Sequence, residues 1–290
     1  MPALVHIDGR VVPAEQARVP VFDRGFLYGD GVYEVFRTYN GVPFGMAAHL
    51  DRMCRSGELL GYELFPSKAA LAEVVGETLA AAEHGDSYVR VMVTRGAGPL
   101  SLDPSMADKP RIVVIVKEVR TPPVEAYRDG IEISIVGVVR TPPGAVDPAA
   151  KSGNYLNNIM ALRQALQRGA SEALMCNVDG KLSEGASSNI FVVHGDAVRT
   201  PSVGAGILEG ITRRNVLDLA AAAGMDAGEG SLEPADLRSA DEAFITSSIR
   251  EILPVCRVDG QAVGGGAPGP ITRRLHEAYK RAVAEATGPT

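Results

Sequence analysis

Two consecutive prolines, Pro122 and Pro123, follow Thr121 and divide the chain of 290 residues. Proline has no backbone N–H and a fixed φ, so a proline pair is extended and cannot continue a sheet ladder. A chain of this length also exceeds one average domain. We therefore predict a small domain over residues 1–120, a linker at 121–124 and a larger domain over residues 125–290.

The hydrophobic patterns on the two sides of this linker differ. Before it, strand signals at 6–12, 32–39, 88–95 and 111–119 alternate with two amphipathic helical patterns, one of which begins at Ser67, a typical N-cap residue. After it, strand signals predominate at 130–140, 172–177, 189–194 and 243–248, with helices expected at 155–167 and 212–223. The second half lacks a regular strand–helix alternation, which predicts an α+β class.

Composition and motif searches argue against several functions. Lys and Arg number 29 against 35 Asp and Glu, and the resulting net charge of −6 provides no general attraction for nucleic acid or anionic lipid. No segment reads as a membrane span or an export signal, and three well-separated cysteines predict a reducing, cytoplasmic location. The five histidines lack metal-binding spacing, so no metal is expected. The glycine-rich segment 204–206 lacks the third glycine of a dinucleotide motif.

Four segments carry residues suited to chemistry. Lys151 precedes a predicted helix, with Tyr155 four residues later, and a lysine in a buried site can attack a carbonyl carbon. Glu184 lies among small residues immediately before an apolar strand. The segments 210–213 and 246–248 open a helix and end a strand, so their amides and hydroxyls could hold a phosphate. Each segment alone also has a purely structural explanation. Lys151 could be a solvated surface lysine, the Glu184 segment a polar hairpin arm, and Thr212 an ordinary N-cap.

Taken in order, these segments resemble the class IV aminotransferases, the fold-type IV group of pyridoxal 5′-phosphate (PLP) enzymes. The segments 28–34 (YGDGVYE) and 48–52 (AHLDR) add to a resemblance that covers nearly the whole chain. It implies a two-domain fold like that of D-amino acid aminotransferase, with a small N-terminal α/β domain and a larger C-terminal pseudo-barrel domain that binds PLP. It also implies a homodimer or higher homo-oligomer, in which the partner's N-terminal domain completes each pocket.

The resemblance further implies a role for each matching residue. Lys151 matches the catalytic lysine, which bonds to the PLP aldehyde and moves the substrate proton. A carboxylate at the pyridine nitrogen keeps the ring protonated, so that the ring can accept electrons from the substrate carbon. The remaining cofactor-binding residues would be Glu184 at this nitrogen, Tyr155 near O3′, and Arg52, Ile211, Thr212 and Ser248 at the phosphate. The substrate-binding residues would be Tyr28, Tyr33, Arg37, Tyr88, Arg90, Ser247, Ile249 and Arg250.

The substrate is predicted from the segments 88–90 and 95–104, which resemble the branched-chain enzymes, where the arginine at the Arg90 position receives the distal carboxylate of glutamate or 2-oxoglutarate. The loop 99–102 has neither the Arg nor the His of familiar D-amino acid transaminases. We expect amino-group transfer from an L-branched-chain or related hydrophobic amino acid to 2-oxoglutarate.

Four positions leave alternatives open. Val35 resembles the D-type strand, and Ile249 and Arg250 replace small residues, so Arg250 would either grip a carboxylate or face solvent. Arg37 is as well explained by a structural ion pair as by substrate binding. A D-amino acid transaminase or a 4-amino-4-deoxychorismate lyase therefore stays possible, with a non-catalytic PLP-binding protein as a remote alternative.

Overall fold

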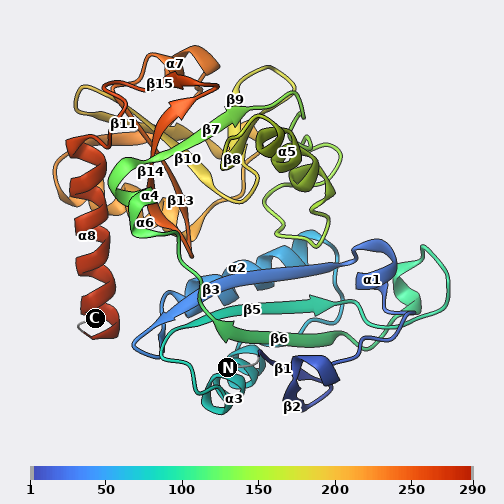
Figure 1. Cartoon of the computed structure of the whole chain (residues 1–290). Coiled ribbons are helices and arrows are strands. Elements are labelled where there is room, and N and C mark those ends of the chain that lie inside the picture. The colour runs from blue at the N-terminus through green and yellow to red at the C-terminus, as the bar shows by residue number, and fades with distance from the viewer. Residues whose placement is uncertain (1–2, 289–290) are drawn as a thin grey trace. The chain divides into compact units, whose positions relative to one another are not determined.

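The computed structural model describes residues 3–288, which divide into two compact units (Figure 1). Within the described residues, the first unit consists of residues 3–120, 150–154 and 283–288, and the second of Thr121–Ala149 and Tyr155–Ala282. The first change of unit falls at Thr121, immediately before the proline pair. The short segment Ala150–Asn154, which follows the linker in sequence, groups with the first unit.

The first unit contains a six-stranded antiparallel sheet with the strand order β2-β1-β6-β5-β3-β4 (Figure 1). Its strands are β1 (Leu4–Ile7), β2 (Arg10–Pro13), β3 (Gly31–Tyr39), β4 (Val42–Pro43), β5 (Ser87–Thr94) and β6 (Arg111–Glu118). Its helices are α1 (Arg24–Tyr28), α2 (Met46–Leu59) and α3 (Lys68–Ala81), with short 3₁₀ turns at Ala14–Gln16 and Pro104–Met106.

Local sequence accounts for the hairpins and helix starts of this unit. Asn40 and Gly41 both have positive φ, 51° and 76°, as a two-residue turn between antiparallel strands requires. The Ser67 side chain accepts a hydrogen bond from the Ala70 N–H, which confirms the predicted N-cap of α3.

The valines of the central strands build the core of the first unit. Val89, Val91 and Val93 on β5 are buried with α2 and α3 side chains that include Leu50 and Leu71. Because side chains alternate across a strand, the residues between these valines project from the opposite face. That face carries Tyr33, Val35, Arg37, Tyr88, Arg90 and Met92, as the alternation predicts.

The second unit contains a mixed nine-stranded sheet with the order β12-β11-β10-β13-β14-β7-β8-β9, and β15 pairs with β14. The sheet curls, so that β9 contacts β10 although they are far apart in this order. Its strands are β7 (Ile131–Ile135), β8 (Glu172–Cys176), β9 (Leu182–Gly185), β10 (Asn189–His194), β11 (Ala197–Pro201), β12 (Asp226–Gly230), β13 (Glu242–Ser247), β14 (Glu251–Val258) and β15 (Gln261–Ala262). Its helices are α4 (Val124–Asp129), α5 (Leu156–Gln167), α6 (Ile211–Ala222) and α7 (Pro234–Arg238), with a 3₁₀ turn at Val203–Ala205, and α8 (Pro270–Thr287) starts in it.

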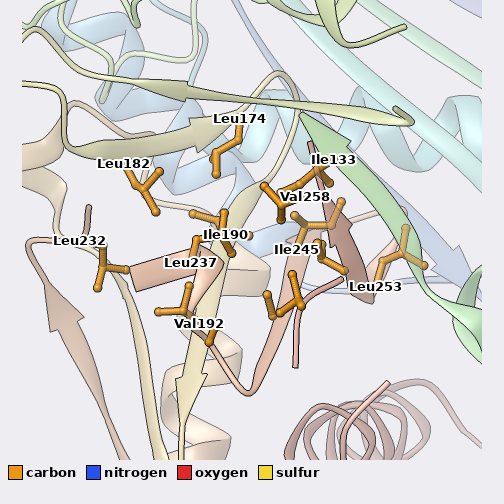
Figure 2. Packing of buried hydrophobic residues seen from close by; sticks show 14 residues of the cluster. Ile133, Leu174, Leu182, Ile190, Val192, Leu232, Leu237, Ile245, Leu253 and Val258 are labelled. Carbon is orange, nitrogen blue, oxygen red and sulfur yellow. The ribbon is translucent and has the colours of Figure 1, made fainter. Parts of the chain in front are cut away.

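Apolar side chains from the curled sheet form the core of the second unit (Figure 2). Leu174, Leu182, Ile190 and Ile245 come from four different strands and are almost completely buried. A second cluster, of small residues, lets α5 lie close to β8. This two-unit mixture of sheets and helices confirms the predicted α+β class.

One predicted strand is too long. The sequence predicts a strand over 130–140, but β7 ends at Ile135. Gly137 interrupts the β-branched run, and its N–H donates to the Gln164 side chain instead of a neighbouring strand. Among residues 3–288, no helix combines the length and the apolar character needed to cross a membrane.

Candidate active site

Lys151 lies in the first unit, in a segment that runs beside the start of β3. Its carbonyl accepts a hydrogen bond from the Tyr33 N–H at 2.9 Å, and the Gly153 N–H donates to the Gly31 carbonyl at 2.8 Å. On the other side, the Lys151 N–H donates to the Ser56 Oγ of α2 at 3.1 Å. These bonds fix the backbone of the lysine segment between a strand and a helix of this unit.

The ring of Tyr33 is shared by two cations. The Lys151 Nζ lies 4.5 Å from the ring centroid, and the Arg90 guanidinium carbon lies 3.9 Å from it. Tyr33 itself is buried, whereas Lys151 and Arg90 are half-buried. Over residues 3–288, the Arg90 guanidinium has no hydrogen-bond acceptor and no carboxylate partner. The structure therefore brings three of the predicted site residues together, the ring of Tyr33 and the two cations that contact it.

Arg52 lies on the opposite side of β3, on helix α2, in a buried cluster with Glu34 and His49. The Arg52 Nε and Nη2 donate to the two Glu34 carboxylate oxygens at 2.7 Å each. The His49 Nδ1 lies 2.7 Å from Glu34 Oε2. Burial alone would raise the pKa of Glu34, but the Arg52 charge and the hydrogen bonds lower it to about 2. Burial lowers the pKa of His49, which keeps its imidazole neutral near pH 7.

Glu184 lies in the second unit, on β9, where Arg140, Asn189 and Leu208 contact its buried carboxylate. The Arg140 Nε and Nη2 contact its Oε1, each at 2.9 Å. Its Oε2 accepts hydrogen bonds from the Leu208 N–H at 2.9 Å and the Asn189 amide at 3.4 Å. A carboxylate held by a guanidinium and amide donors is suited to accept a hydrogen bond from a protonated ring nitrogen.

The predicted phosphate contacts of the second unit lie at one helix start and one strand end. Gly210 is the N-cap of α6 and supplies no capping side chain, so the first-turn N–H groups at Ile211 and Thr212 are suited to an anion. A Cβ at Gly210 would lie only 2.0 Å from the Asn189 side chain, which explains the glycine. Ser248 follows β13, and Tyr155 is the N-cap residue of α5.

Other predicted substrate residues have protein partners. Arg37 stacks on Tyr39 at 4.1 Å and contacts the Asp86 carboxylate at 3.3 Å. Arg24 lies 5.1 Å from the Tyr28 ring centroid. Tyr88 lies under Lys117 at 5.0 Å, directly across from Arg37 in the sheet register.

Arg250 does not simply face solvent. Its Nη1 lies 2.7 Å from the buried Glu172 carboxylate, and its Nε donates to the Ser247 Oγ at 3.2 Å. Ser247, Ile249 and Arg250 are all half-buried.

Sequence reasoning did not single out four polar partners in these clusters: Glu34, His49, Arg140 and Glu172. For Glu34 and His49 the sequence holds a signal. Glu34 neighbours Tyr33 on a strand, so its side chain points to the opposite face of the sheet, and His49 and Arg52 are three residues apart and share one face of a helix. Arg140 and Glu172 are far in sequence from the residues they pair with, so no local pattern indicates them. Within residues 3–288, no group of three or more His, Cys, Asp or Glu side chains could hold a metal ion.

A family model described as amino-transferase class IV matches residues 31–258. This chain is a class IV aminotransferase. It is 41% identical to a putative branched-chain-amino-acid aminotransferase of Methanocaldococcus jannaschii over 276 residues, 95% of each chain. A D-alanine aminotransferase of Bacillus licheniformis is 33% identical, with 99% of each chain covered. An aminodeoxychorismate lyase of Bacillus subtilis is 32% identical, with 97% of this chain and 94% of the lyase covered.

Solved structures share the fold of this class IV aminotransferase. The branched-chain aminotransferase of Thermoproteus uzoniensis with norvaline matches with a TM-score of 0.90 and 32% identity, over 97% of this chain and 95% of that one. The two-domain fold-type IV architecture is thereby confirmed.

Class IV aminotransferases depend on PLP, and each unit by itself carries groups of a type that suits part of this cofactor. In the first unit, the Lys151 amine beside Tyr33 is of the type that bonds to an aldehyde. In the second unit, the Glu184 carboxylate is suited to a protonated ring nitrogen, and the first-turn amides of α6 are suited to a phosphate.

Proposed function

We propose that this class IV aminotransferase transfers the amino group of L-branched-chain or related hydrophobic amino acids to 2-oxoglutarate. The observation that carries the proposal is the guanidinium of Arg90, which lies on the Tyr33 ring with no carboxylate partner in the described chain. A half-buried cation without a protein anion is suited to receive an anionic substrate group. The Arg90 guanidinium and the Lys151 amine lie on the same Tyr33 ring. Arg90 is therefore near enough to Lys151 to bind the distal carboxylate of 2-oxoglutarate.

The same sheet face supports a hydrophobic amino donor. Val35 pairs directly with Arg90 across β3 and β5, and Tyr33 pairs with Met92. These apolar groups surround the cation, so one site could accept an aliphatic side chain in one half-reaction and a carboxylate in the other. The identity with the Methanocaldococcus jannaschii relative is in keeping with this substrate class.

In the reaction, PLP bound to the protein supplies an electron-accepting ring for the bonds at the substrate α-carbon. We infer that Lys151 would hold the cofactor at its aldehyde, and that the Lys151 amine would move the proton at the substrate α-carbon. Glu184, held by Arg140, would keep the proton on the ring nitrogen. Arg52, Ile211, Thr212 and Ser248 would bind the phosphate, and Tyr155 would orient the ring through O3′.

Substitution of Lys151 and Arg90 tests these roles. Lys151→Ala should abolish turnover. Arg90→Met should raise KM for 2-oxoglutarate and L-glutamate about tenfold or more, with KM for L-leucine little changed. Arg10→Met, an exposed position of β2 in the same sheet, is the matched control. Equal effects of Arg90→Met on both substrates would overturn the role of Arg90.

Product analysis separates the alternatives. Conversion of D-alanine but not L-leucine would make the protein a D-amino acid transaminase, in line with the 33% identical D-alanine aminotransferase. Release of pyruvate with p-aminobenzoate from aminodeoxychorismate would make it a lyase, in line with the relative from Bacillus subtilis. Bound PLP without turnover of any amino donor would identify a non-catalytic binding protein.

We also propose a homodimer or higher homo-oligomer located in the cytoplasm. Phe26 on α1 and Leu102 in the loop between β5 and β6 are 72% and 80% exposed, and Phe22 and Leu100 of the same two segments are also exposed. Arg24 joins the two segments by donating to the Ser101 carbonyl at 2.6 Å. Such an apolar surface favours self-association. Light scattering of the eluting protein tests it, and a monomer at micromolar concentration would contradict it.

A further inference from the structure

Arg250 contacts three separate segments of the second unit. Its Nη1 pairs with Glu172 on β8, and its Nη2 donates to the Ser187 carbonyl at 3.0 Å and Oγ at 2.9 Å. Its Nε donates to the Ser247 Oγ at 3.2 Å. All three guanidinium nitrogens thus have acceptors within the protein. This arginine is already bound and is not poised to grip a substrate carboxylate.

Glu172 extends these contacts to the turn after β9. Its side chain is almost completely buried and accepts hydrogen bonds from the N–H groups of Ala173 and Ala186, at 3.0 and 3.1 Å. The hydroxyls of Ser187 and Ser188 donate to it at 3.3 and 3.2 Å. These contacts hold the turn at residues 186–188, which connects β9 to β10. Glu184 and Asn189 lie on the two sides of this turn, and the Asn189 amide donates to the Glu184 carboxylate.

The turn between β13 and β14 is held from the other side. The Arg250 N–H donates to the Ser247 Oγ at 3.2 Å, and the Tyr127 hydroxyl donates to the Arg250 carbonyl at 3.2 Å. Glu251 has a φ of 55°, a left-handed conformation that is unfavourable for this residue, and its carboxylate pairs with His276 at 2.9 Å. Such a conformation persists only where surrounding contacts hold it.

We propose that the Arg250–Glu172 ion pair is a positioning device for the cofactor. It ties the 247–250 turn, which carries Ser248, to the 186–188 turn beside Glu184. The distance between Ser248 and Glu184 then depends on one ion pair, between the half-buried Arg250 and the buried Glu172. This inference rests on the proposed roles of Ser248 and Glu184. It makes Arg250 and Glu172 residues that act through the two turns and not by touching the substrate.

The test is the affinity of the full-length apoprotein for PLP, measured by absorbance titration, together with KM and kcat for L-leucine. Arg250→Met and Glu172→Gln should each weaken PLP binding and raise KM about tenfold, since the first removes the cation from the buried Glu172 carboxylate and the second removes the anion from the half-buried Arg250 guanidinium. The double variant should be no worse than the poorer single variant, and Arg250→Lys should recover part of the loss. Arg199→Met, which removes the 2.6 Å pair with Asp226, should leave PLP affinity unchanged.

Three outcomes would overturn the proposal. If Arg250 binds a substrate carboxylate directly, Glu172→Gln will leave KM unchanged or lower it. If the pair is merely structural, the melting temperature will fall while PLP affinity and KM stay at the parent values. Additive losses in the double variant would show that the two groups act separately. Ser248→Ala separates the phosphate role of Ser248 from the positioning role of the ion pair. Unchanged PLP affinity of Ser248→Ala would contradict the proposed phosphate role itself. Weakened affinity of Ser248→Ala, together with unchanged affinity of Arg250→Met, would contradict only the positioning role.

Discussion

Replacing Glu34 by Gln removes the charge at the centre of the buried Glu34–Arg52–His49 cluster. Glu34 is fully buried, and two Arg52 nitrogens lie 2.7 Å from its oxygens. The glutamine has nearly the same shape, so the substitution tests the charge and not the packing. It removes the negative charge that two Arg52 nitrogens contact, and breaking a buried ion pair costs about 3–5 kcal/mol in comparable pairs.

The lowered pKa of Glu34 gives a similar estimate of the stability that its charge contributes. Its pKa falls from 4.5 to about 2, and at about 1.4 kcal/mol per pH unit this corresponds to about 3 kcal/mol of stability at pH 7. Because the folded-state pKa is the lower one, this contribution is complete above about pH 4.5 and is lost as the pH falls through about 2. The difference between the parent and Glu34→Gln should therefore shrink by about 1 kcal/mol from pH 7 to pH 3.5.

Urea unfolding of the apoprotein, followed by circular dichroism at a fixed protein concentration, measures this difference. Glu118→Gln, an exposed position on β6, is the control and should change the free energy of unfolding by less than about 0.5 kcal/mol. Equal stability of Glu34→Gln and the parent at pH 7 would refute the reasoning. So would a difference that stays constant down to pH 3.5.

Three further predictions concern the second unit. The Glu242 carboxylate accepts the Thr272 N–H at 2.7 Å at the start of α8, so Glu242→Ala should lower the free energy of unfolding by about 1–2 kcal/mol in urea titrations. Gly130 has a φ of 78°, and a Cβ there would lie 2.2 Å from the Cys256 sulfur, so Gly130→Ala should cost about 2 kcal/mol or more by the same measurement. Burial raises the pKa of Cys256 to about 11, so labelling with a disulfide reagent at pH 8, located by mass spectrometry, should modify this thiol only after unfolding.

Local sequence accounts for much of the framework of both units. The turns at Asp8–Gly9 and Asn40–Gly41 adopt the left-handed conformations that their residues favour. Alternating valines predict which strand face meets α2 and α3. Such features depend on the backbone preferences of a few neighbouring residues, so one sequence is enough to find them. By contrast, β7 is shorter than its β-branched run indicates, because a glycine and a side-chain acceptor interrupt the ladder.

The candidate site divides in the same way. The types of the key groups, the amine of Lys151 and the carboxylate of Glu184, could be recognised from the order of the motifs. The partners that set their chemical state could not, because Arg140 is 44 residues from Glu184 and only the fold brings them together. The sequence places Arg90 on a strand face together with aromatic residues. Only the packed structure shows that no carboxylate of the described chain pairs with it. Sequence determines which groups a chain can offer, whereas tertiary structure decides their charge and availability, because electrostatic interactions depend on distance in space and on burial.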